Sequence, residues 1–568
     1  MLTRLASRRV ISSLQHQYQH QHQAAAARIC ARSLIRHYSA STPIKKPSVL
    51  KKLFKYTVGT GFLAVTGFVG WVYYKIYQES HPIEQEPQSP VFPTGEKKKT
   101  LVILGSGWGA IPLLKSIDTT LYNVILISPR NYFLFTPLLP SVPTGTVDMK
   151  SIIEPVRSIT RRCKGEVQYL EAEAVDIDPE NNTLKVQQST TVYSGHSNED
   201  SSASHLTKSH EHGLDLITAK VKYDYLVVAI GAQPSTFGLP GVAEHSTFVK
   251  EVSDSARIKK SIVDLTEAAN MLPENDKERK RLLHIIVCGG GPTGVEAAGE
   301  IQDYIDQDLK KWMPEVAHDL RVTLVESQPK VLHTFSPKLV EYTNQIFKDT
   351  NINLMTNTRI TAVDDSYVTA WHKDSNKTEV IPYGMLIWAT GNATRSFTKI
   401  VMSKIDAQKN AKRGFLVDEH LRLKGSENIY ALGDCTFTKY PPTAQVAFQQ
   451  GEYLANYFEK LQKLASLKYK IEHESHPTEM LQHRAEKLET KLPKFTYNYM
   501  GSLAYIGSEK AVADLAWGSW SNVSAGGNLT FLFWRSAYIY MCLSVKNQVM
   551  VCMDWVKVYL FGRDCSRE

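Results

Sequence analysis

The chain has 568 residues, of which 43% are hydrophobic, 22% charged and 10% aromatic, a globular composition that excludes collagen, a coiled coil or disorder as a description of the whole. The formal charge of +9 is concentrated at one end, because residues 1–78 contain twelve of the 66 Lys and Arg residues and none of the 57 acids. The other residues carry 54 basic and 57 acidic side chains, a net charge of −3 that disfavours a nucleic-acid-binding body, which typically has a basic surface.

The first 38 residues have the composition of a mitochondrial presequence. They contain six arginines, several serine, alanine and glutamine residues and no acid, which is the pattern of a targeting segment. The residues Arg36-His37-Tyr38-Ser39 predict cleavage after Tyr38. A disordered basic tail is the alternative interpretation.

Residues 39–98 are expected to contain a hydrophobic segment and a linker. Residues 56–74 carry no charge, and they are just long enough for a helix to cross about 30 Å of hydrocarbon. Lysines precede this run and acids follow it, so the positive-inside rule places the body in the intermembrane space, at the mitochondrial inner membrane. The alternatives are a sorting signal that is removed and a segment that is only peripheral. Residues 82–99 are rich in Pro, Glu and Lys and form the linker.

The first domain opens with a glycine-rich phosphate loop. An apolar strand at 101–104 enters a GxGxxA pattern, and a second strand is expected at 123–127. The first glycine permits a tight turn, the second lets a pyrophosphate approach the backbone, and the following helix offers N–H donors. The loop residues are Gly105, Ser106, Gly107, Trp108, Gly109 and Ala110; the second strand is followed by Ser128, Pro129, Arg130 and Asn131, where a ribose-binding acid is common.

A second loop of this kind occurs later in the chain. An apolar strand at 285–288 enters a GxGxxG pattern, and the next strand, at 321–325, ends in Glu326. A carboxylate in that position accepts hydrogen bonds from both ribose hydroxyls and repels a 2′-phosphate, so NADH is favoured over NADPH. The loop residues are Gly289, Gly290, Gly291, Pro292, Thr293 and Gly294. The two loops predict a flavoprotein with non-covalent FAD in the first domain and NADH in the second; two purely structural turns are the alternative.

Three further apolar runs, at 225–231, 386–391 and 428–434, end in small residues of the kind that lie beside a cofactor. They contribute Ala229, Gly231, Ala389, Thr390, Gly391, Gly433 and Asp434, the last expected to accept a hydrogen bond from a ribityl hydroxyl. Their order is that of the glutathione-reductase-like flavoproteins. The predicted fold class is therefore α/β, with two Rossmann-like dinucleotide-binding domains and a C-terminal membrane-associated helical region.

The expected domain boundaries follow from these motifs. Residues 99–280 and 395–500 form the two parts of the FAD-binding domain, and residues 281–394 form the NADH-binding domain. Residues 501–568 form a C-terminal region of membrane association and dimerisation. The polar insert at 187–220 and the charged, helix-prone insert at 459–494 are expected on the surface, without an assigned function.

Longer motifs resemble the alternative (type II) NADH dehydrogenases, which are single-chain NADH:ubiquinone oxidoreductases that pump no protons. These motifs are ISPRNYFLFTPLLPS at 127–141, TAQVAFQQG at 443–451, WRSAY at 534–538 and FGRD at 561–564. The resemblance covers about residues 97–568 and, with the N-terminus, suggests the external form of a fungal mitochondrion. It implies rotenone-insensitive transfer of a hydride from NADH to FAD, followed by two-electron reduction of ubiquinone.

On matching residues, the resemblance implies roles for several side chains. Gln445 and Gln449, in the AQxAxQ motif that begins at Ala444, would line the quinone pocket, and their spacing places both amides on one helix face. Tyr505 would lie beside flavin and quinone, and Lys510 near the edge of the flavin. Glu296 would lie near the nicotinamide, where a role as proton carrier is a hypothesis. The expected catalytic residues are Glu296, Gln445, Gln449, Tyr505 and Lys510.

The C-terminal residues are expected to contact the membrane. Residues 529–543 are short for a span, but their aromatic side chains suit a membrane interface. Cys552, Trp555, Val556 and Tyr559 recur at the spacing of one helix face, which predicts an amphipathic helix in the headgroup region. A core helix or a dimer interface is the alternative, and the resemblance implies a homodimer formed through this region.

Other classes share part of the pattern. A sulfide:quinone oxidoreductase needs cysteines near the flavin, and of the seven scattered cysteines only Cys435 is suitably placed. A disulfide reductase needs a CxxxxC pair, which the sequence lacks. A protein like apoptosis-inducing factor would use the fold for partner or DNA binding, which the charge of the body disfavours. The scattered cysteines also disfavour a zinc site, and no metal is expected.

Overall fold

The computed structural model describes residues 49–189, 217–473, 479–516, 522–564 and 566. The chain divides into two compact units, Met1–Tyr73 and Tyr74–Glu568. The predicted presequence and most of the 187–220 insert lie outside the described residues.

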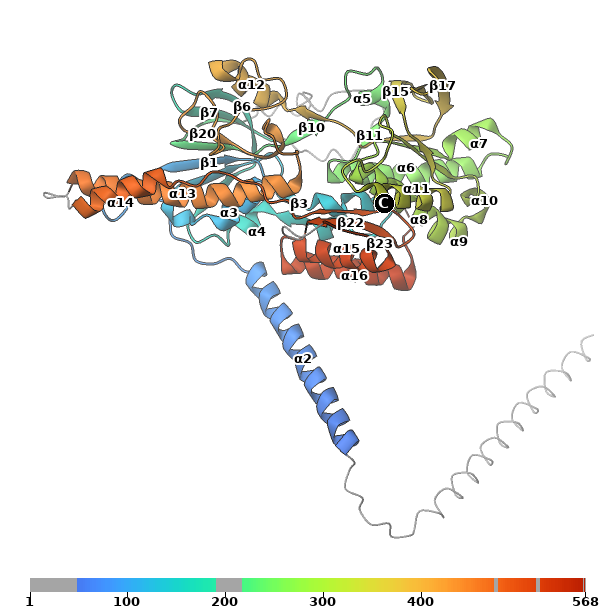
Figure 1. Cartoon of the computed structure of the whole chain (residues 1–568), viewed down its shortest axis with the longest axis horizontal. Coiled ribbons are helices and arrows are strands. Elements are labelled where there is room, and N and C mark those ends of the chain that lie inside the picture. The colour runs from blue at the N-terminus through green and yellow to red at the C-terminus, as the bar shows by residue number, and fades with distance from the viewer. Residues whose placement is uncertain (1–48, 190–216, 474–478, 517–521, 565, 567–568) are drawn as a thin grey trace, which may run out of the picture. The chain divides into compact units, whose positions relative to one another are not determined.

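Two five-stranded parallel sheets form the frame of the second unit (Figure 1). In spatial order, the first consists of β20 (Ile429–Ala431), β9 (Tyr225–Val228), β1 (Thr100–Leu104), β2 (Asn123–Ile127) and β5 (Val167–Leu170). The second consists of β11 (Thr247–Phe248), β18 (Met385–Trp388), β12 (His284–Cys288), β13 (Arg321–Val325) and β14 (Asn353–Met355). The α/β class with two such sheets is confirmed, and β2 and β13 have the predicted bounds.

Each sheet is buried on both faces, which explains why its strands are continuous apolar runs rather than alternating ones. Helices α3 (Ala110–Ser116) and α13 (Ala444–His473) share a core with one face of the first sheet, and α12 (Ser396–Lys404) shares one with the other. Helices α6 (Val252–Asn270), α8 (Pro292–Tyr304) and α11 (Pro337–Asp349) pack on the second sheet. The parallel strands end in register, with Leu104 paired with Ile127 and Val228, so the loops that follow them gather at one edge.

We call the part of the protein built around each parallel sheet a lobe, so that the first lobe contains the first sheet and the second lobe the second sheet. Smaller elements complete the two lobes. Antiparallel sheets are formed by β6 (Ala172–Asp178), β7 (Thr183–Gln188) and β8 (Thr218–Lys222), and by β15 (Thr358–Val363), β16 (Tyr367–His372) and β17 (Lys377–Pro382). The pairs β3 (Tyr132–Leu134) with β4 (Ile153–Pro155), and β10 (Ala232–Pro234) with β19 (Asn392–Thr394), are also antiparallel. The shorter helical segments include η2 (Thr136–Ser141), α4 (Val156–Thr160), α5 (Val242–His245), α7 (Lys277–Leu282), the π-helix η4 (Ile305–Leu309), α9 (Lys310–Trp312) and α10 (Pro314–Ala317).

The insert predicted at 459–494 is helical over 459–473 and 479–490, and residues 491–494 follow without helical structure. It forms the second half of α13 and the helix α14 (Glu479–Thr490), which pack on each other at one end of the molecule (Figure 1). Lys468 and Glu489 join them by an ion pair of 3.1 Å between exposed side chains.

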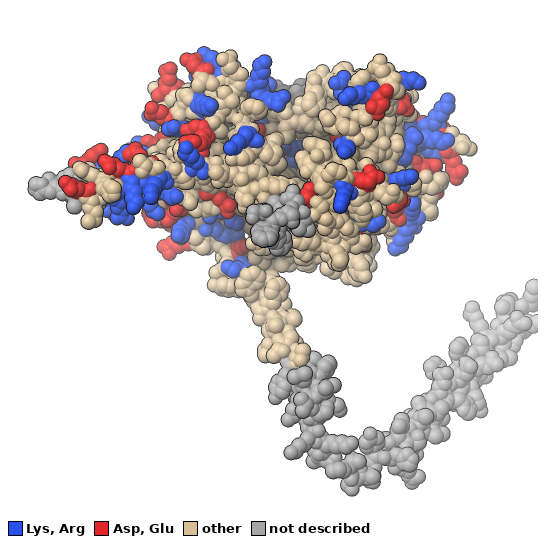
Figure 2. Space-filling model, viewed as in Figure 1, with Lys and Arg blue, Asp and Glu red and all other residues tan. Residues whose placement is uncertain are grey.

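The C-terminal region consists of a small sheet and two helices. Strands β21 (Ser502–Tyr505), β22 (Ala511–Ala516) and β23 (Asn522–Gly527) are antiparallel, and α15 (Asn528–Met541) and α16 (Val545–Phe561) follow. The inner side of this helix pair joins the core of the first lobe through Trp534, Tyr538 and Trp555. The outer side is apolar and exposed at Leu529, Leu532, Phe533, Tyr540, Met541, Met553, Val556, Tyr559, Leu560 and Phe561. Figure 2 shows few charges over this helix pair in the view drawn.

The predicted stripe on α16 is only partly correct. Trp555 is buried, Cys552 is half-buried, and Val556 and Tyr559 are exposed to solvent. The stripe therefore straddles two environments, because α16 has apolar side chains on both its inner and its outer side. The spacing of the apolar residues identified the helix, but it did not show which side of the helix is buried.

Helix α2 (Val49–Ser80) contains the uncharged residues 56–74. In the part of the chain that the structure describes, no helix combines the length and the hydropathy needed to cross a bilayer, in contrast to the span expected there. The physical reason is composition, since four glycines and three threonines interrupt the apolar residues of this stretch.

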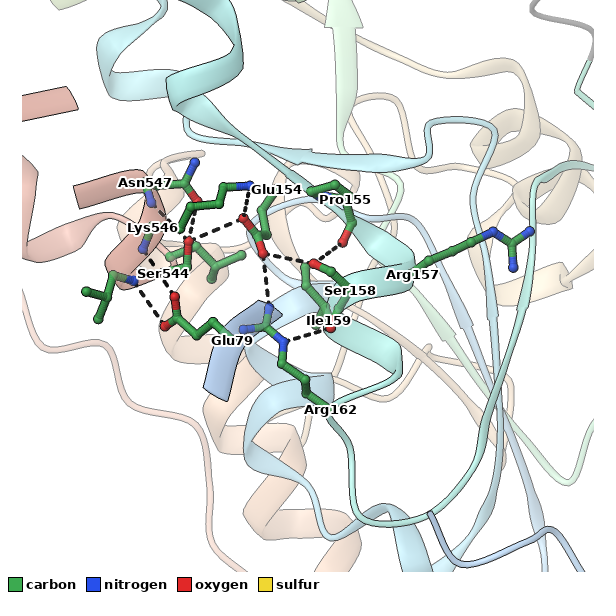
Figure 3. A network of polar contacts seen from close by, with 12 residues as sticks. Glu79, Glu154, Pro155, Arg157, Ser158, Ile159, Arg162, Ser544, Lys546 and Asn547 are labelled. Atoms are coloured by element: carbon green, nitrogen blue, oxygen red, sulfur yellow. Dashed lines mark hydrogen bonds and ion pairs between the residues drawn. The ribbon is translucent and has the colours of Figure 1, made fainter. Parts of the chain in front are cut away.

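The end of α2 at Glu79 belongs to the second unit and takes part in a polar network that we call the Glu154 cluster (Figure 3). The Glu79 carboxylate accepts hydrogen bonds from the backbone N–H groups of Val545 and Lys546, at 3.0 and 3.2 Å. The buried Glu154 contacts Arg162 at 3.0 Å and Lys546 at 3.1 Å, and its other partners are the hydroxyls of Ser158 and Ser544. The cluster thus fixes the start of α16 to the first lobe.

Candidate active site

The first phosphate loop is glycine-rich for two different reasons. Gly105 has φ of 106°, and a Cβ there would collide with the carbonyl oxygen of Ala229. A Cβ on Gly109 would collide with Leu432. Over Gly107, in contrast, the nearest atom to a Cβ would be Arg130 Nη2 at 3.9 Å. The loop is therefore tightly packed below and open at its second glycine, as a bound pyrophosphate requires.

The second loop repeats this arrangement. Gly289 has φ of 121° and would place a Cβ 2.8 Å from the carbonyl oxygen of Ala389, while a Cβ on Gly294 would collide with Gly289. No atom lies within 4 Å of the position that a Cβ on Gly291 would occupy. Pro292 and Thr293 begin α8 directly behind this open position, so the N–H groups of a helix N-terminus face it.

Glu326 lies where the ribose-binding acid was predicted. Its carboxylate accepts hydrogen bonds from the N–H groups of Gly290 and Gln328, both at 2.6 Å, and from the Ser327 hydroxyl at 3.0 Å. A Cβ on Gly290 would lie 2.8 Å from this carboxylate. The acid is thus held at the loop by backbone donors, and glycine is needed so that it can come so close.

The first domain has a cation where a generic dinucleotide site has an acid. Ser128 donates to Ser106 at 3.0 Å, and the Ser106 hydroxyl donates to the carbonyl of Arg130 at 3.0 Å, which ties the end of β2 to the loop. The Arg130 guanidinium, 2.8 Å from Glu251, lies beside Gly107. A positive charge at the open glycine complements a pyrophosphate.

Arg395 is a residue that the sequence interpretation missed. It precedes α12, its Nε is buried without a hydrogen-bond partner, and its charge interacts with those of Arg130 and Glu251. Burial lowers the pKa of Arg395. No local motif marks it, because its proximity to Arg130 arises only from the folded arrangement.

A second residue that the sequence interpretation missed is Gln450, on helix α13 beside the first phosphate loop. Its Oε1 accepts a hydrogen bond from the N–H of Gly433 at 2.7 Å, while its Nε2 is buried without a partner. A Cβ on Gly451 would collide with the carbonyl of Gly109, so α13 packs directly on the phosphate loop. The third glutamine of the QVAFQQ run was the available signal. The orphaned donor, the open glycines and the cation together fit FAD.

The remaining predicted cofactor residues follow strands of both sheets: Gly231 and Gly433 in the first, and Gly391 in the second. Gly231, Gly391 and Gly433 have φ of 65°, 81° and 74°, which other residues rarely adopt. Asp434 follows Gly433 and lies 3.8 Å from the Lys250 ammonium. The predicted residues placed around the ends of the two sheets also include Trp108, Ala110, Pro129, Asn131 and Thr390.

Gln445 and Gln449 lie on α13 and both contact the segment 497–501. Gln449 exchanges two hydrogen bonds with the backbone of Asn498, at 2.8 and 2.9 Å. Gln445 accepts from the Tyr497 hydroxyl and from the N–H of Met500, at 3.2 Å for the latter. The predicted common face is therefore present, and it holds the chain that leads into β21.

Three carboxylates project from one buried face of α8, and we call Glu296, Glu300 and Asp303 the acid ladder. Glu296 accepts from the N–H of Tyr505 at 3.2 Å. Asp303 accepts from the Tyr505 hydroxyl and from the N–H of Ser508, at 2.8 Å for the latter. A Cβ on Gly299 would lie 2.8 Å from the backbone N of Gly507, so the β21–β22 hairpin presses directly on this face.

Burial decides the protonation of the acid ladder. It raises the pKa of Glu296 to about 8 and that of Asp303 to about 6, because neither carboxylate has a strong cationic partner of its own. Burial also raises the pKa of Tyr505, whose hydroxyl faces Asp303. Lys510 lies in the same hairpin, where its backbone N–H bonds to Gly507.

A cavity of about 210 Å³ adjoins the ladder. Its walls come from α8, η4, the β21–β22 hairpin, α15, α16 and the C-terminal residues, and they include Glu300, Tyr505, Arg535 and Arg563. Arg563 lies 2.9 Å from Asp308 and 3.8 Å from Glu300, and all three side chains are buried.

Cys435, the thiol that a sulfide-oxidising enzyme would use, is fully buried beside Asp434. It donates to the backbone carbonyls of Val228 and Leu432, and burial raises the pKa of the thiol to about 12. It therefore has the properties of a core residue rather than of a redox thiol.

Comparison with known proteins agrees with this geometry. Residues 99–451 match the pyridine nucleotide-disulphide oxidoreductase family, and residues 499–564 match the NDH2 C-terminal domain. The chain is 46% identical to the mitochondrial external NADH-ubiquinone oxidoreductase 2 of Saccharomyces cerevisiae, over 93% of this chain and 95% of that protein. It is also 46% identical to the external alternative NADH-ubiquinone oxidoreductase of Yarrowia lipolytica, over 89% and 86%. The structure of NDH2 from Plasmodium falciparum in complex with NADH has a TM-score of 0.70 and 28% identity, covering 83% of this chain and 100% of that one.

Proposed function

The chain belongs to the family of mitochondrial alternative (type II) NADH-ubiquinone oxidoreductases, and we propose that it oxidises NADH and reduces ubiquinone without pumping protons. The observation that carries this proposal is the pair of open phosphate loops, one beside Arg130 and one beside Glu326, at the edges of two parallel sheets. When bound, FAD supplies the two-electron chemistry between the two substrates. The protein residues bind and orient the reactants.

The NADH side depends on Glu326. Its position at the end of β13 suits the two ribose hydroxyls and disfavours a 2′-phosphate. We expect Glu326→Gln to relax the preference for NADH over NADPH, measured as the ratio of kcat/KM values. An unchanged ratio would contradict the assignment. Ser327→Ala, which alters the neighbouring contact at 3.0 Å, is the matched control.

The quinone side depends on Gln445 and Gln449. Neutral amides can donate to quinone carbonyls without burying a charge. Gln445→Met and Gln449→Met should damage quinone reduction while sparing the reduction of the flavin by NADH. Stopped-flow absorbance separates the two half-reactions. Loss of flavin reduction in both variants would show that the glutamines serve the fold, through their contacts with 497–501, rather than quinone.

The same relatives support a proposal for the location of the protein. The relatives are named external and mitochondrial, and the exposed apolar side of α15 and α16 suits a lipid surface. We therefore place the enzyme as a homodimer on the inner membrane, with its body in the intermembrane space. Digestion of intact mitoplasts tests this orientation, because a body protected from protease would contradict it.

One assay tests reaction and side together. Intact mitochondria containing the protein should take up oxygen on added NADH in the presence of rotenone. Sulfide as the donor provides the control for a sulfide:quinone oxidoreductase, and the burial of Cys435 leads us to expect no response to it.

A further inference from the structure

The cavity beside the acid ladder has polar groups inside and an opening to solvent. Glu509 and Tyr559 line it and are themselves exposed, whereas Thr146, Glu300 and Arg563 line it and are buried. Its volume of about 210 Å³ is enough for several water molecules, since one needs roughly 15 Å³. The buried polar side chains provide the hydrogen-bond partners that such waters need.

Quinone reduction consumes a proton that NADH does not bring. In the reaction NADH + H⁺ + quinone → NAD⁺ + quinol, the hydride carries two electrons and one proton. The quinol contains two added protons, so one proton must enter from solvent in each turnover. The buried interior around Glu296 therefore needs a route for it.

Resting on the proposed function, we propose that this cavity is the intake for that proton and that Glu300 passes it along α8 to Glu296. Glu300 lines the cavity and lies one helical turn from Glu296, a spacing of about 6 Å between neighbouring side chains. Tyr505 and Trp534 also line the cavity, and the backbone N–H of Tyr505 contacts Glu296. Because Glu300 lines the cavity, its carboxylate is accessible to any water molecule there.

The hydroxyl groups around Glu300 suit proton transfer. Ser141 donates to one carboxylate oxygen at 2.8 Å, and Thr144 and Thr146 donate to the other at 3.2 and 2.6 Å. A hydroxyl both donates and accepts, so this set can reorient as a proton passes. Thr146 itself lines the cavity and completes the contact between water and carboxylate.

The charges around Glu300 leave the ladder rich in acid. The titratable and charged groups around Glu300 and Glu296 come from α8, η4, the hairpin, α15 and the C-terminus: Asp303, Asp308, Tyr505, Glu509, Arg535, Tyr538 and Arg563. Asp308 already shares Arg563, at 2.9 Å. With the pKa of Glu296 near 8 and that of Asp303 near 6, the ladder holds exchangeable protons at neutral pH.

The test uses the full-length flavoprotein in three variants. Glu300→Gln removes the titratable group, Val558→Phe fills the cavity and leaves Glu300 in place, and Asp308→Asn alters the other acid that contacts Arg563. The enzyme is first reduced with NADH and then mixed with short-chain ubiquinone in H₂O or D₂O. Absorbance follows the flavin, and a pH-indicator dye follows proton uptake.

We expect Glu300→Gln and Val558→Phe to slow both reoxidation and dye-detected proton uptake by at least about tenfold, because proton transfer by a positioned group contributes roughly 10²–10⁴-fold. Both should increase the solvent isotope effect and displace the pH profile. Asp308→Asn should lower Tm as Glu300→Gln does, but with the isotope effect of the unmodified protein.

Two results would overturn the proposal. One is proton uptake and a pH profile in Glu300→Gln that match those of the unmodified protein. The other is an equal change of the isotope effect in Asp308→Asn, which would mean that stability alone is affected. Failure of the proposed function would look different, because the unmodified enzyme, once reduced by NADH, would then not be reoxidised by ubiquinone.

Discussion

Two groups of buried acids flank the C-terminal helices, and they are built in opposite ways. In the Glu154 cluster, one buried carboxylate has two cations, Arg162 and Lys546, within 3.1 Å. In the acid ladder, Glu300 lies 3.8 Å from Arg563, and this cation is also paired with Asp308, at 2.9 Å. Burial raises the pKa of Glu296 to about 8 and that of Asp303 to about 6.

This difference distinguishes a structural contact between segments from a group of acids that can take part in proton transfer. A buried acid with matched cations holds segments together, as Glu154 holds α16 and α4 (Figure 3). Buried acids with too few cationic partners retain protons that can be transferred. Such an arrangement destabilises the folded protein but makes proton transfer possible. The following variants break or sharpen this contrast, from the largest expected effect to the smallest.

Removal of Arg563 should have the largest effect. Arg563→Met leaves Glu300 and Asp308 buried without their cation, and breaking such a pair costs about 3–5 kcal/mol. Tm of the purified flavoprotein measures this loss of stability. Arg162→Met is the matched control, since Glu154 keeps Lys546. Equal decreases in Tm in the two variants would show that the two acid groups do not differ in how strongly they depend on one cation.

Removal of Glu154 should have a somewhat smaller effect. Glu154→Ala leaves Arg162 and Lys546 without their acid, but both are partly exposed and can be solvated, so we expect about 3 kcal/mol. Thermal unfolding measures this, and quinone reduction per folded enzyme should be retained. Loss of quinone reduction with an unchanged Tm would assign the cluster to the reaction instead.

Glu296 should make stability depend on pH in a defined direction. Its pKa is raised from 4.5 to about 8 by burial, so the folded protein keeps a proton that the unfolded chain releases. The stability of the unmodified protein should therefore fall as the pH rises from about 4.5 to 8, by up to roughly 1.4 kcal/mol per pH unit. Glu296→Gln lacks this contribution, so the Tm of the variant relative to the unmodified protein should increase over that window. If Tm changes with pH in the same way in Glu296→Gln and in the unmodified protein, the pKa of Glu296 is not raised.

The sequence predicted the two phosphate loops because their information is local. Each consists of an apolar strand, closely spaced glycines and a helix start, and the structure places Gly107 and Gly291 as that pattern requires. The family motifs likewise identified α13 and the helices near the C-terminus.

The two acid groups could not be predicted in the same way. The spacing of Glu296, Glu300 and Asp303 on one helix face is visible in the sequence, but it resembles an ordinary solvated face. This face is buried by segments distant in the chain, namely the hairpin around Tyr505 and the hydroxyl-bearing segment that contains Ser141. Glu79, Glu154 and Lys546 likewise meet through the fold alone.

The smallest expected effect comes from a matched pair of hydroxyls. Ser141 donates to Glu300 and Ser158 donates to Glu154, each at 2.8 Å. Ser141→Ala should cost about 2 kcal/mol, because removal of a donor to a buried acceptor costs roughly 1–3 kcal/mol when no other partner replaces it. Ser158→Ala should cost less than about 1 kcal/mol, since Arg162 and Lys546 continue to stabilise Glu154. Unfolding measurements at one pH compare the two directly. Because the distances are equal, a larger loss in Ser158→Ala would mean that cationic partners do not decide how much a buried acid depends on its remaining donors.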